Sequence, residues 1–351
     1  MAKFRVNLQE LFKNKVGSTL VVLGLLLLFN LFFTKNFFVI TIHEGHLIGT
    51  LIDILNRGAP LMLLSMGMTL VIASTGGVDL SVGAIMAITG SMVCKLIGGT
   101  LILVEGVQSY ATQTPMLLAI IAGLGLAMLF GLWNGVLVAY GRIVPIVATL
   151  VLMVAGRGVA QLITAGQIIT VYYRPFFFIG GGWFLGLPFA IFIALFVFIL
   201  AQAFTRKTSL GLFIESVGGN ASASWYAGIN EKAVKVLAYV FCGFCAGVAG
   251  LIYCSNVKSA DANNTGLNIE LDAILAAAIG GTNLAGGKFN LVGSLVAALL
   301  IQTLTTTIYA FGVPPEVTLV VKALVVVILL FVQSTVASDL FNRLVKRGSL
   351  G

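Results

Sequence analysis

Long stretches without a charged residue constrain this chain more than any other feature. Residues 16–33 and 116–139 contain no Asp, Glu, Lys or Arg. A helix needs about 20 apolar residues to cross the hydrocarbon core of a bilayer. Over the whole chain 59% of the residues are hydrophobic and 9% are charged, against about 25% charged residues in a soluble domain. The sequence therefore predicts an all-α polytopic membrane protein. It excludes a soluble enzyme, a nucleic-acid-binding domain and a disordered chain.

Ten apolar stretches predict about ten membrane-spanning helices within one transmembrane domain, residues 1–351. Gly-rich turns at 75–77 and 280–287 separate neighbouring stretches so closely that we expect one or two broken or re-entrant segments. Such segments are tolerated where the backbone lines a cavity. The predicted spans are 16–33, 58–74, 80–98, 116–139, 144–165, 186–204, 233–253, 270–286, 289–310 and 317–333.

The distribution of Lys and Arg predicts the orientation. With both termini in the cytoplasm, 13 of the 20 basic residues lie inside, because Arg157 and Lys322 fall within spans and five lie outside. Basic residues collect on the cytoplasmic side of membrane proteins. We therefore expect a cytoplasmic N-terminus (1–15), a membrane bundle (16–333) with a cytoplasmic loop at 205–232, and a cytoplasmic C-terminus (334–351).

Three motifs that suggest catalysis or metal binding do not meet the requirements of those sites. Cys242 and Cys245 have C-x-x-C spacing, but they lie in an apolar run, where buried cysteines pack as small residues. His43 and His46 lack the i, i+4 spacing of a helical metal motif. Residues 281–288 resemble a phosphate-binding loop but have one residue too many before the lysine. We expect no metal, no cofactor and no enzymatic activity on this chain.

Polar residues within the apolar stretches are the candidate substrate pathway, because ionisable groups are costly in hydrocarbon. Alternatives remain open: Asp79 is also suited to capping the next helix, Asn134 to an interhelical hydrogen bond, and Arg157 to an ion pair or the membrane interface. Glu270 and Asp272 fit the first turn of a helix, where negative charge is favourable. The candidate pathway residues are Thr75, Asp79, Ser81, Asn134, Arg157 and Gln161.

The predicted cytoplasmic loop presents aromatic side chains on short amphipathic stretches. Trp225 and Tyr226 follow a break at residues 218–220. Exposed aromatic residues on a short helix favour a docking surface. The alternative is an interfacial helix that lies on lipid.

The chain resembles the permease subunits of ribose-type ABC sugar importers over essentially its whole length. Its GVDLSVG motif lies at 77–83 and its GGTNLAGG motif at 280–287. The other matching segments are 67–73, 131–135, 215–220 and 270–274.

The resemblance implies a transport subunit that imports a monosaccharide by alternating access across the bacterial inner membrane. It implies three protein partners: a second permease, identical or different, an ABC ATPase that hydrolyses ATP, and a periplasmic sugar-binding protein. Membrane lipid surrounds the subunit, and no nucleic acid is expected. The resemblance also implies that a coupling helix seats in the ATPase. Its candidate residues are Glu215, Gly218, Gly219 and Asn220.

Within this family the similarity is greatest to the galactofuranose permeases. It rests on residues 52–57, 148–167 and 260–264, and the last segment implies that Asp261, Asn263 and Asn264 face the periplasm. Residues 281–283 instead resemble the ribose-type permeases, so ribose, arabinose and xylose remain alternative substrates. An ion-coupled secondary transporter or channel and a non-transporting scaffold are alternatives of other classes.

Overall fold

The computed structural model describes residues 15–43, 45–98, 101–104, 107–110 and 114–332. Residues 1–14 of the predicted cytoplasmic N-terminus (1–15) and the whole predicted C-terminus (334–351) lie outside these residues. Most of the chain is helical. The long helices are α2 (Lys15–Phe33), α3 (Thr50–Thr75), α4 (Val82–Ile97), α5 (Met116–Ala139), α6 (Pro145–Thr164), α8 (Phe189–Lys207), α11 (Glu231–Val257), α13 (Leu291–Ala310) and α14 (Pro315–Val332). The short helices are α7 (Arg174–Gly181), α9 (Leu210–Gly219), α10 (Ala221–Tyr226) and α12 (Ile269–Ile279).

Every predicted span overlaps one of these helices. Within the described residues, seven helices are long and apolar enough to cross a membrane: α2, α3, α5, α6, α8, α11 and α13. α12 has 11 residues and extends about 16 Å, roughly half the hydrocarbon thickness. The described chain is thus a mostly helical, polytopic membrane protein.

The predicted span 270–286 is too long at its C-terminal end. α12 ends at Ile279, because the following glycines have a backbone that a helix does not allow. Gly281, Gly286 and Gly287 have φ values of 99°, 94° and 89°, in a region that side chains disfavour.

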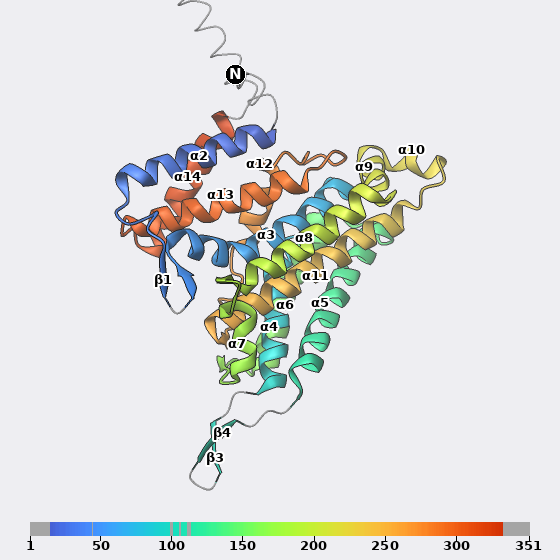
Figure 1. Cartoon of the computed structure of the whole chain (residues 1–351). Helices are drawn as coiled ribbons and strands as arrows, with labels where there is room; N and C mark the ends of the chain where they lie inside the picture. Colours follow the sequence, from blue (N-terminus) through green and yellow to red (C-terminus); the bar gives the residue numbers. More distant parts are fainter. Residues whose placement is uncertain (1–14, 44, 99–100, 105–106, 111–113, 333–351) are drawn as a thin grey trace, which may run out of the picture.

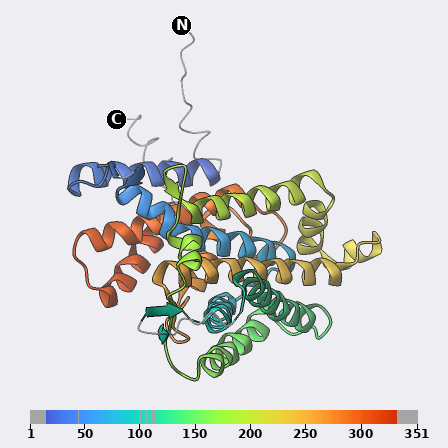
Figure 2. The same cartoon turned by 60° about the horizontal axis from the view of Figure 1, so that its bottom comes forward.

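The helices α3 and α11 form the centre of the bundle (Figure 1). α4, α5 and α6 pack on one side of this pair, and α2, α13 and α14 lie on the other (Figure 2). Of the seven candidate spans, α3 is the most buried: 94% of its 18-residue apolar stretch lies inside the protein. The surrounding helices keep large apolar side chains exposed, as expected for surfaces that face lipid.

Small residues bring the central helices together. A Cβ atom on Gly67 of α3 would lie 2.8 Å from Cα of Cys242 on α11, and one on Gly131 of α5 would lie 2.5 Å from the carbonyl oxygen of Tyr239. Lipid is as apolar as the side chains, so the hydrophobic effect does not drive helices together inside a bilayer. Membrane helices associate instead by close packing of this kind. Cys242 and Cys245 are buried free thiols at this contact, which agrees with their predicted packing role.

Short strand pairs gather at one end of the bundle, which we call the strand end. These strands lie only in the connections between helices, so the main elements are helical as predicted. β1 (Thr41–His43) pairs with β2 (His46–Ile48), and β3 (Leu101–Val104) pairs with β4 (Val107–Tyr110). The remaining pairs are β5 (Ile169–Thr170) with β8 (Ser259–Ala260), and β6 (Trp183–Phe184) with β7 (Leu187–Pro188). The opposite end carries α9 and α10 (Figure 1) and is called the α9–α10 end.

Candidate functional site

The structure joins three of the predicted pathway residues in one buried network. Asp79 and Ser81 lie in the connection between α3 and α4, and Asn134 projects from α5. The backbone N–H and the hydroxyl of Ser81 donate to Asp79 Oδ1 at 2.9 and 2.6 Å. Asn134 Nδ2 donates to Ser81 Oγ at 2.8 Å. All three residues are fully buried. The hydrogen bond of Asn134 joins α5 to the α3–α4 connection, which is close to the interhelical bond that was its alternative role.

This network retains unused hydrogen-bonding capacity. Asp79 Oδ2 and Asn134 Oδ1 are buried without a hydrogen-bond partner among the described residues. Unsatisfied buried polar atoms are costly, so native proteins keep few of them. These oxygens are able to bind hydroxyl groups if the helices separate.

The role of Asp79 at the start of α4 is a variant of the predicted cap. Its carboxylate accepts the N–H of Ser81, which directly precedes the helix. A standard N-cap accepts from the second or third helical residue. Asp79 therefore fixes the turn before α4 instead of capping its first turn.

Thr75 lies at the edge of this network, where its side chain is close to the Tyr239 hydroxyl of α11. Its hydroxyl donates to the Val71 carbonyl at 2.8 Å and accepts the N–H of Gly77 at 3.1 Å. Both bonds are local to the end of α3. They shape the turn into the α3–α4 connection.

Arg157 and Gln161 form a second, separate cluster with the loop that follows β8. Arg157 Nη1 donates to the carbonyl oxygens of Ala262, at 3.2 Å, and Thr265. Gln161 Nε2 donates to Asn263 Oδ1 at 2.6 Å. Backbone carbonyl groups thus hold Arg157. They take the place of the ion pair that was one of its two alternatives. The six predicted pathway residues do not form one site.

The loop at 261–264 is organised by a single carboxylate. Asp261 Oδ1 accepts the backbone N–H groups of Asn263 and Asn264 at 2.8 and 3.2 Å, and Oδ2 accepts Asn264 Nδ2 at 2.7 Å. The side-chain bond from Asn264, the two backbone bonds and the nearby Arg157 hold the pKa of Asp261 below its ordinary value of 3.8. The loop therefore presents an ionised, exposed carboxylate beside two amides at the strand end.

Three Gly-containing segments meet at the α9–α10 end. A Cβ atom on Gly218, near the end of α9, would lie 1.7 Å from the Ala73 carbonyl oxygen and 2.5 Å from the Gly287 nitrogen. The N–H of Gly287 donates to that same Ala73 oxygen at 2.8 Å. We call this contact of α9, the end of α3 and the 280–287 loop the glycine junction.

The other predicted coupling residues surround the glycine junction. The backbone of Glu215 borders Gly287, and Gly219 has open space where a Cβ atom would lie. Asn220 Oδ1 accepts the N–H of Ala223 at 3.0 Å and caps α10. Beyond them Trp225 and Tyr226 are 63% and 83% exposed.

Comparison with known proteins shows the family. Residues 50–330 match the family described as "Branched-chain amino acid transport system / permease component". This chain belongs to that permease family.

Three curated relatives of this permease transport sugars according to their names. It is 50% identical over 315 residues to the galactofuranose transporter permease protein YtfT of Escherichia coli (strain K12), covering 90% of this chain and 88% of the relative. It is 34% identical to the fructose import permease protein FruF of Bifidobacterium longum, covering 97% and 94%. It is 35% identical to the ribose import permease protein RbsC of Escherichia coli (strain K12), covering 82% and 86%. No solved structure matches it.

Sequence reasoning missed one buried ion pair of the permease. Lys322 Nζ on α14 lies 2.6 Å from Asp272 Oδ2 on α12, with both side chains mostly buried. Asp272 and Glu270 do lie in the first turn of α12, as expected. Two opposite charges within apolar stretches were the available signal, because unpaired charges in a membrane are costly.

Proposed function

We propose that this permease is the membrane subunit of an ATP-driven ABC importer that carries galactofuranose across the bacterial inner membrane by alternating access. The observation that carries the proposal is 50% identity to the galactofuranose transporter permease protein over 90% of the chain. A transport subunit of this family has no ATPase activity of its own. It assembles with a second permease, an ABC ATPase and a periplasmic sugar-binding protein.

The proposed orientation places the α9–α10 end in the cytoplasm, with both termini, and the strand end in the periplasm. Arg206 and Lys207 end α8, and Lys232 and Lys235 lie in the first turns of α11, so basic residues border the α9–α10 end. Arg142 lies in the α5–α6 turn at the same end. This bias follows the positive-inside rule. The proposed single transmembrane domain makes about ten crossings, in which α12 and the 280–287 loop form a broken segment.

In the proposed mechanism the ATPase moves α9, and the glycine junction passes that movement to α3. Gly218 contacts the carbonyl oxygen of Ala73, one turn before the α3–α4 connection that holds Asp79 and Ser81. Close backbone contact leaves no side chain to absorb a displacement, since packed interfaces shift between discrete arrangements. Glu215, Gly218, Gly219 and Asn220 are therefore the proposed coupling residues.

The sugar's proposed path uses the two polar clusters in turn. Asp261, Asn263 and Asn264 lie beside Arg157 and Gln161 at the strand end, where the binding protein would deliver the sugar. Asp79, Ser81 and Asn134 would meet it deeper in the bundle, with Thr75 beyond them. Their free oxygens suit hydroxyl groups, and weak binding suits a site that must release its cargo.

The specificity test is ATP hydrolysis by the complex of this permease, its ATPase and its binding protein in lipid. Galactofuranose, ribose, fructose and galactopyranose are added one at a time. We expect galactofuranose to stimulate hydrolysis most. Stimulation by ribose or fructose instead would support the importer function but contradict galactofuranose as the substrate. These two sugars appear in the names of the relatives at 35% and 34% identity.

A further inference from the structure

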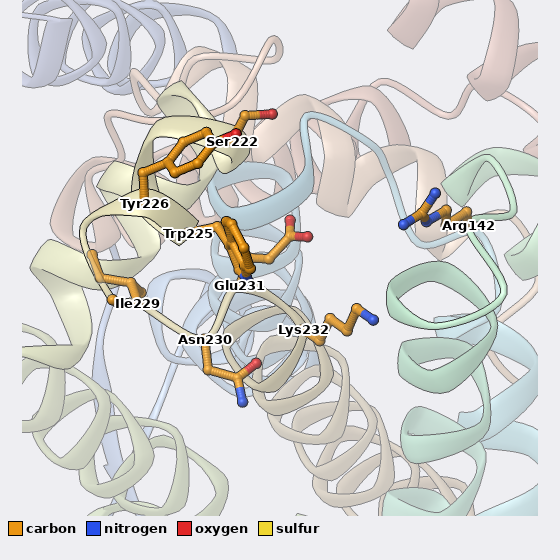
Figure 3. Close-up of a pocket in the computed structure, with 9 residues that line it drawn as sticks. Arg142, Ser222, Trp225, Tyr226, Ile229, Asn230, Glu231 and Lys232 are labelled. Carbon is orange, nitrogen blue, oxygen red and sulfur yellow. The ribbon is translucent and has the colours of Figure 1, made fainter.

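A cavity of about 680 Å³ opens at the α9–α10 end, between α10, the start of α11 and the α5–α6 turn. Figure 3 shows Lys232 extending from α11 toward the turn that carries Arg142, with Trp225 and Tyr226 on the α10 side. The lining of the cavity includes Arg142, Trp225, Tyr226, Glu231 and Lys232. We call it the basic cavity.

The charge of the basic cavity is positive. Glu231 is already paired with Lys235, whose Nζ lies 2.7 Å from its carboxylate. Lys232 Nζ lies 5.1 Å from the centre of the Tyr140 ring, a cation–π contact that leaves the ammonium donors free. Arg142 is exposed and has no ion pair within the described chain. Two cations are thus available to one ligand.

The backbone holds Arg142 in this position. Its φ of 52° lies in the left-handed region, which non-glycine residues rarely adopt outside turns that need it. Strained residues of this kind cluster at ligand sites. The turn between α5 and α6 places Arg142 across the cavity from α10, facing the start of α11 (Figure 3).

An apolar groove of about 400 Å³ lies along the seam between α5 and α11. Tyr140 borders the groove and stacks against Lys232 of the cavity, so the two spaces adjoin. Leu132, Val136 and Leu237 on its walls are 39%, 41% and 47% exposed. The groove is lined by Leu132, Val136, Tyr140, Ala233, Val236, Leu237 and Val240.

We propose that the basic cavity and this groove bind one anionic phospholipid. Its phosphate lies between Arg142 and Lys232, and one acyl chain lies in the groove. Charge complementarity selects the head group, since basic pockets between membrane helices bind anionic lipid head groups. The division into a cationic mouth at the helix ends and an apolar channel along the helices matches a single amphiphilic molecule. Trp225, Tyr226 and Tyr140 supply the aromatic side chains that favour the membrane interface.

Native mass spectrometry of the full chain in a neutral detergent tests this proposal. Dioleoylphosphatidylglycerol and dioleoylphosphatidylcholine are titrated separately. We expect the wild type to retain phosphatidylglycerol in preference. The double variant Arg142→Gln/Lys232→Gln should bind phosphatidylglycerol about 30-fold more weakly, because each basic residue contributes about 1 kcal/mol to anionic lipid binding. Binding of phosphatidylcholine should not change.

Two further variants separate the cavity from the groove. Val136→Trp fills the groove and should also weaken retention of phosphatidylglycerol. The matched control Lys35→Gln/Arg174→Gln removes two exposed cations at the strand end and should leave it unchanged. Monodispersity and thermal melting establish that each variant folds. If the double variant does not fold, the single variant Arg142→Gln replaces it in the lipid titration.

Four outcomes would overturn the proposal. They are equal retention of the two lipids by the wild type, equal effects of the cavity and control variants, displacement of the lipid by inorganic phosphate alone, and full retention by Val136→Trp. A change of oligomeric state in the cavity variant without any change in lipid retention would assign this surface to a protein contact instead. None of these readouts depends on which sugar is carried.

Discussion

At the scale of single residues, Ser81 holds the buried network together. It donates to Asp79 and accepts from Asn134, so it links the α3–α4 connection to α5. Ser91 offers a comparison, because it is also buried, lies on α4, the helix that Ser81 directly precedes, and its hydroxyl has no partner among the described residues.

Ser81→Ala should therefore lower the free energy of unfolding by about 1–3 kcal/mol, the cost of leaving buried polar groups unpaired. Ser91→Ala should change it little or raise it, because an unpaired buried hydroxyl is lost. Thermal melting of both variants in detergent measures the difference. Equal melting temperatures for the two variants would show that the network contributes nothing to stability.

Asp261 should make the strand end sensitive to acid. Its pKa is lowered in the folded protein by the hydrogen bonds from Asn264 and Asn263. A lowered pKa stabilises the fold fully above the unfolded value, 3.8, and this contribution is lost as pH falls through the lower folded value. The melting temperature of wild type should exceed that of Asp261→Asn at pH 7, and the two should converge below pH 3.8. A constant difference across that range would contradict the assignment.

The sequence predicts which polar residues are buried but not which of them contact one another. The pattern selected Asp79, Ser81 and Asn134 correctly as buried polar groups, because a polar residue in an apolar stretch stands out. It could not group them, since Asn134 and Ser81 are separated by 53 positions and Gln161 and Asn263 by 102. Contacts over such distances depend on how helices pack, and one sequence does not show that packing.

At the scale of elements, the glycine junction gives adjacent glycines opposite sensitivities. Gly218→Ala places a methyl group 1.7 Å from the Ala73 carbonyl oxygen, whereas a methyl group at Gly219 meets nothing within 4 Å. Gly218→Ala must displace α9 from α3, so it should abolish most ATP-driven uptake while the protein still inserts. Gly219→Ala should retain it. Uptake into vesicles, normalised to inserted protein, measures both, and equal uptake would remove the junction from coupling.

The ion pair between α12 and α14 should behave as a unit. Removing either partner leaves a mostly buried charge alone, which costs about 3–5 kcal/mol, whereas replacing both by apolar residues is often neutral. Lys322→Met and Asp272→Leu should each lower the melting temperature, and the double variant should recover most of the loss. Additive losses in a double-mutant cycle would show that the 2.6 Å contact is not an energetic pair.

Elements were predicted well where apolarity alone defines them. Residues 116–139 form α5 at the predicted bounds, because nothing polar interrupts them. α3 begins at Thr50 instead of residue 58, since Asp53, Asn56 and Arg57 lower the hydropathy of a segment that is nevertheless helical. The eight-residue helix α7 was missed because it is shorter than any membrane span.

At the scale of the whole molecule, one architecture connects both ends of the bundle. The strand end carries the Asp261 loop, which contacts α6, and the α9–α10 end carries the glycine junction, which contacts α3. Between them lies the buried network of Asp79, Ser81 and Asn134 at the α3–α4 connection. The coupling that we propose between an ATPase and the sugar pathway would act through these three sites.

The most direct test of this account is uptake of radiolabelled galactofuranose into proteoliposomes that contain the permease, its ATPase and its binding protein. Uptake should require ATP on the side of the proteoliposome membrane where the ATPase lies. It should stop when the ATPase is omitted. It should not respond to an imposed proton or sodium gradient. Uptake that persists without ATP and follows an ion gradient would contradict the coupled importer and establish a secondary transporter instead.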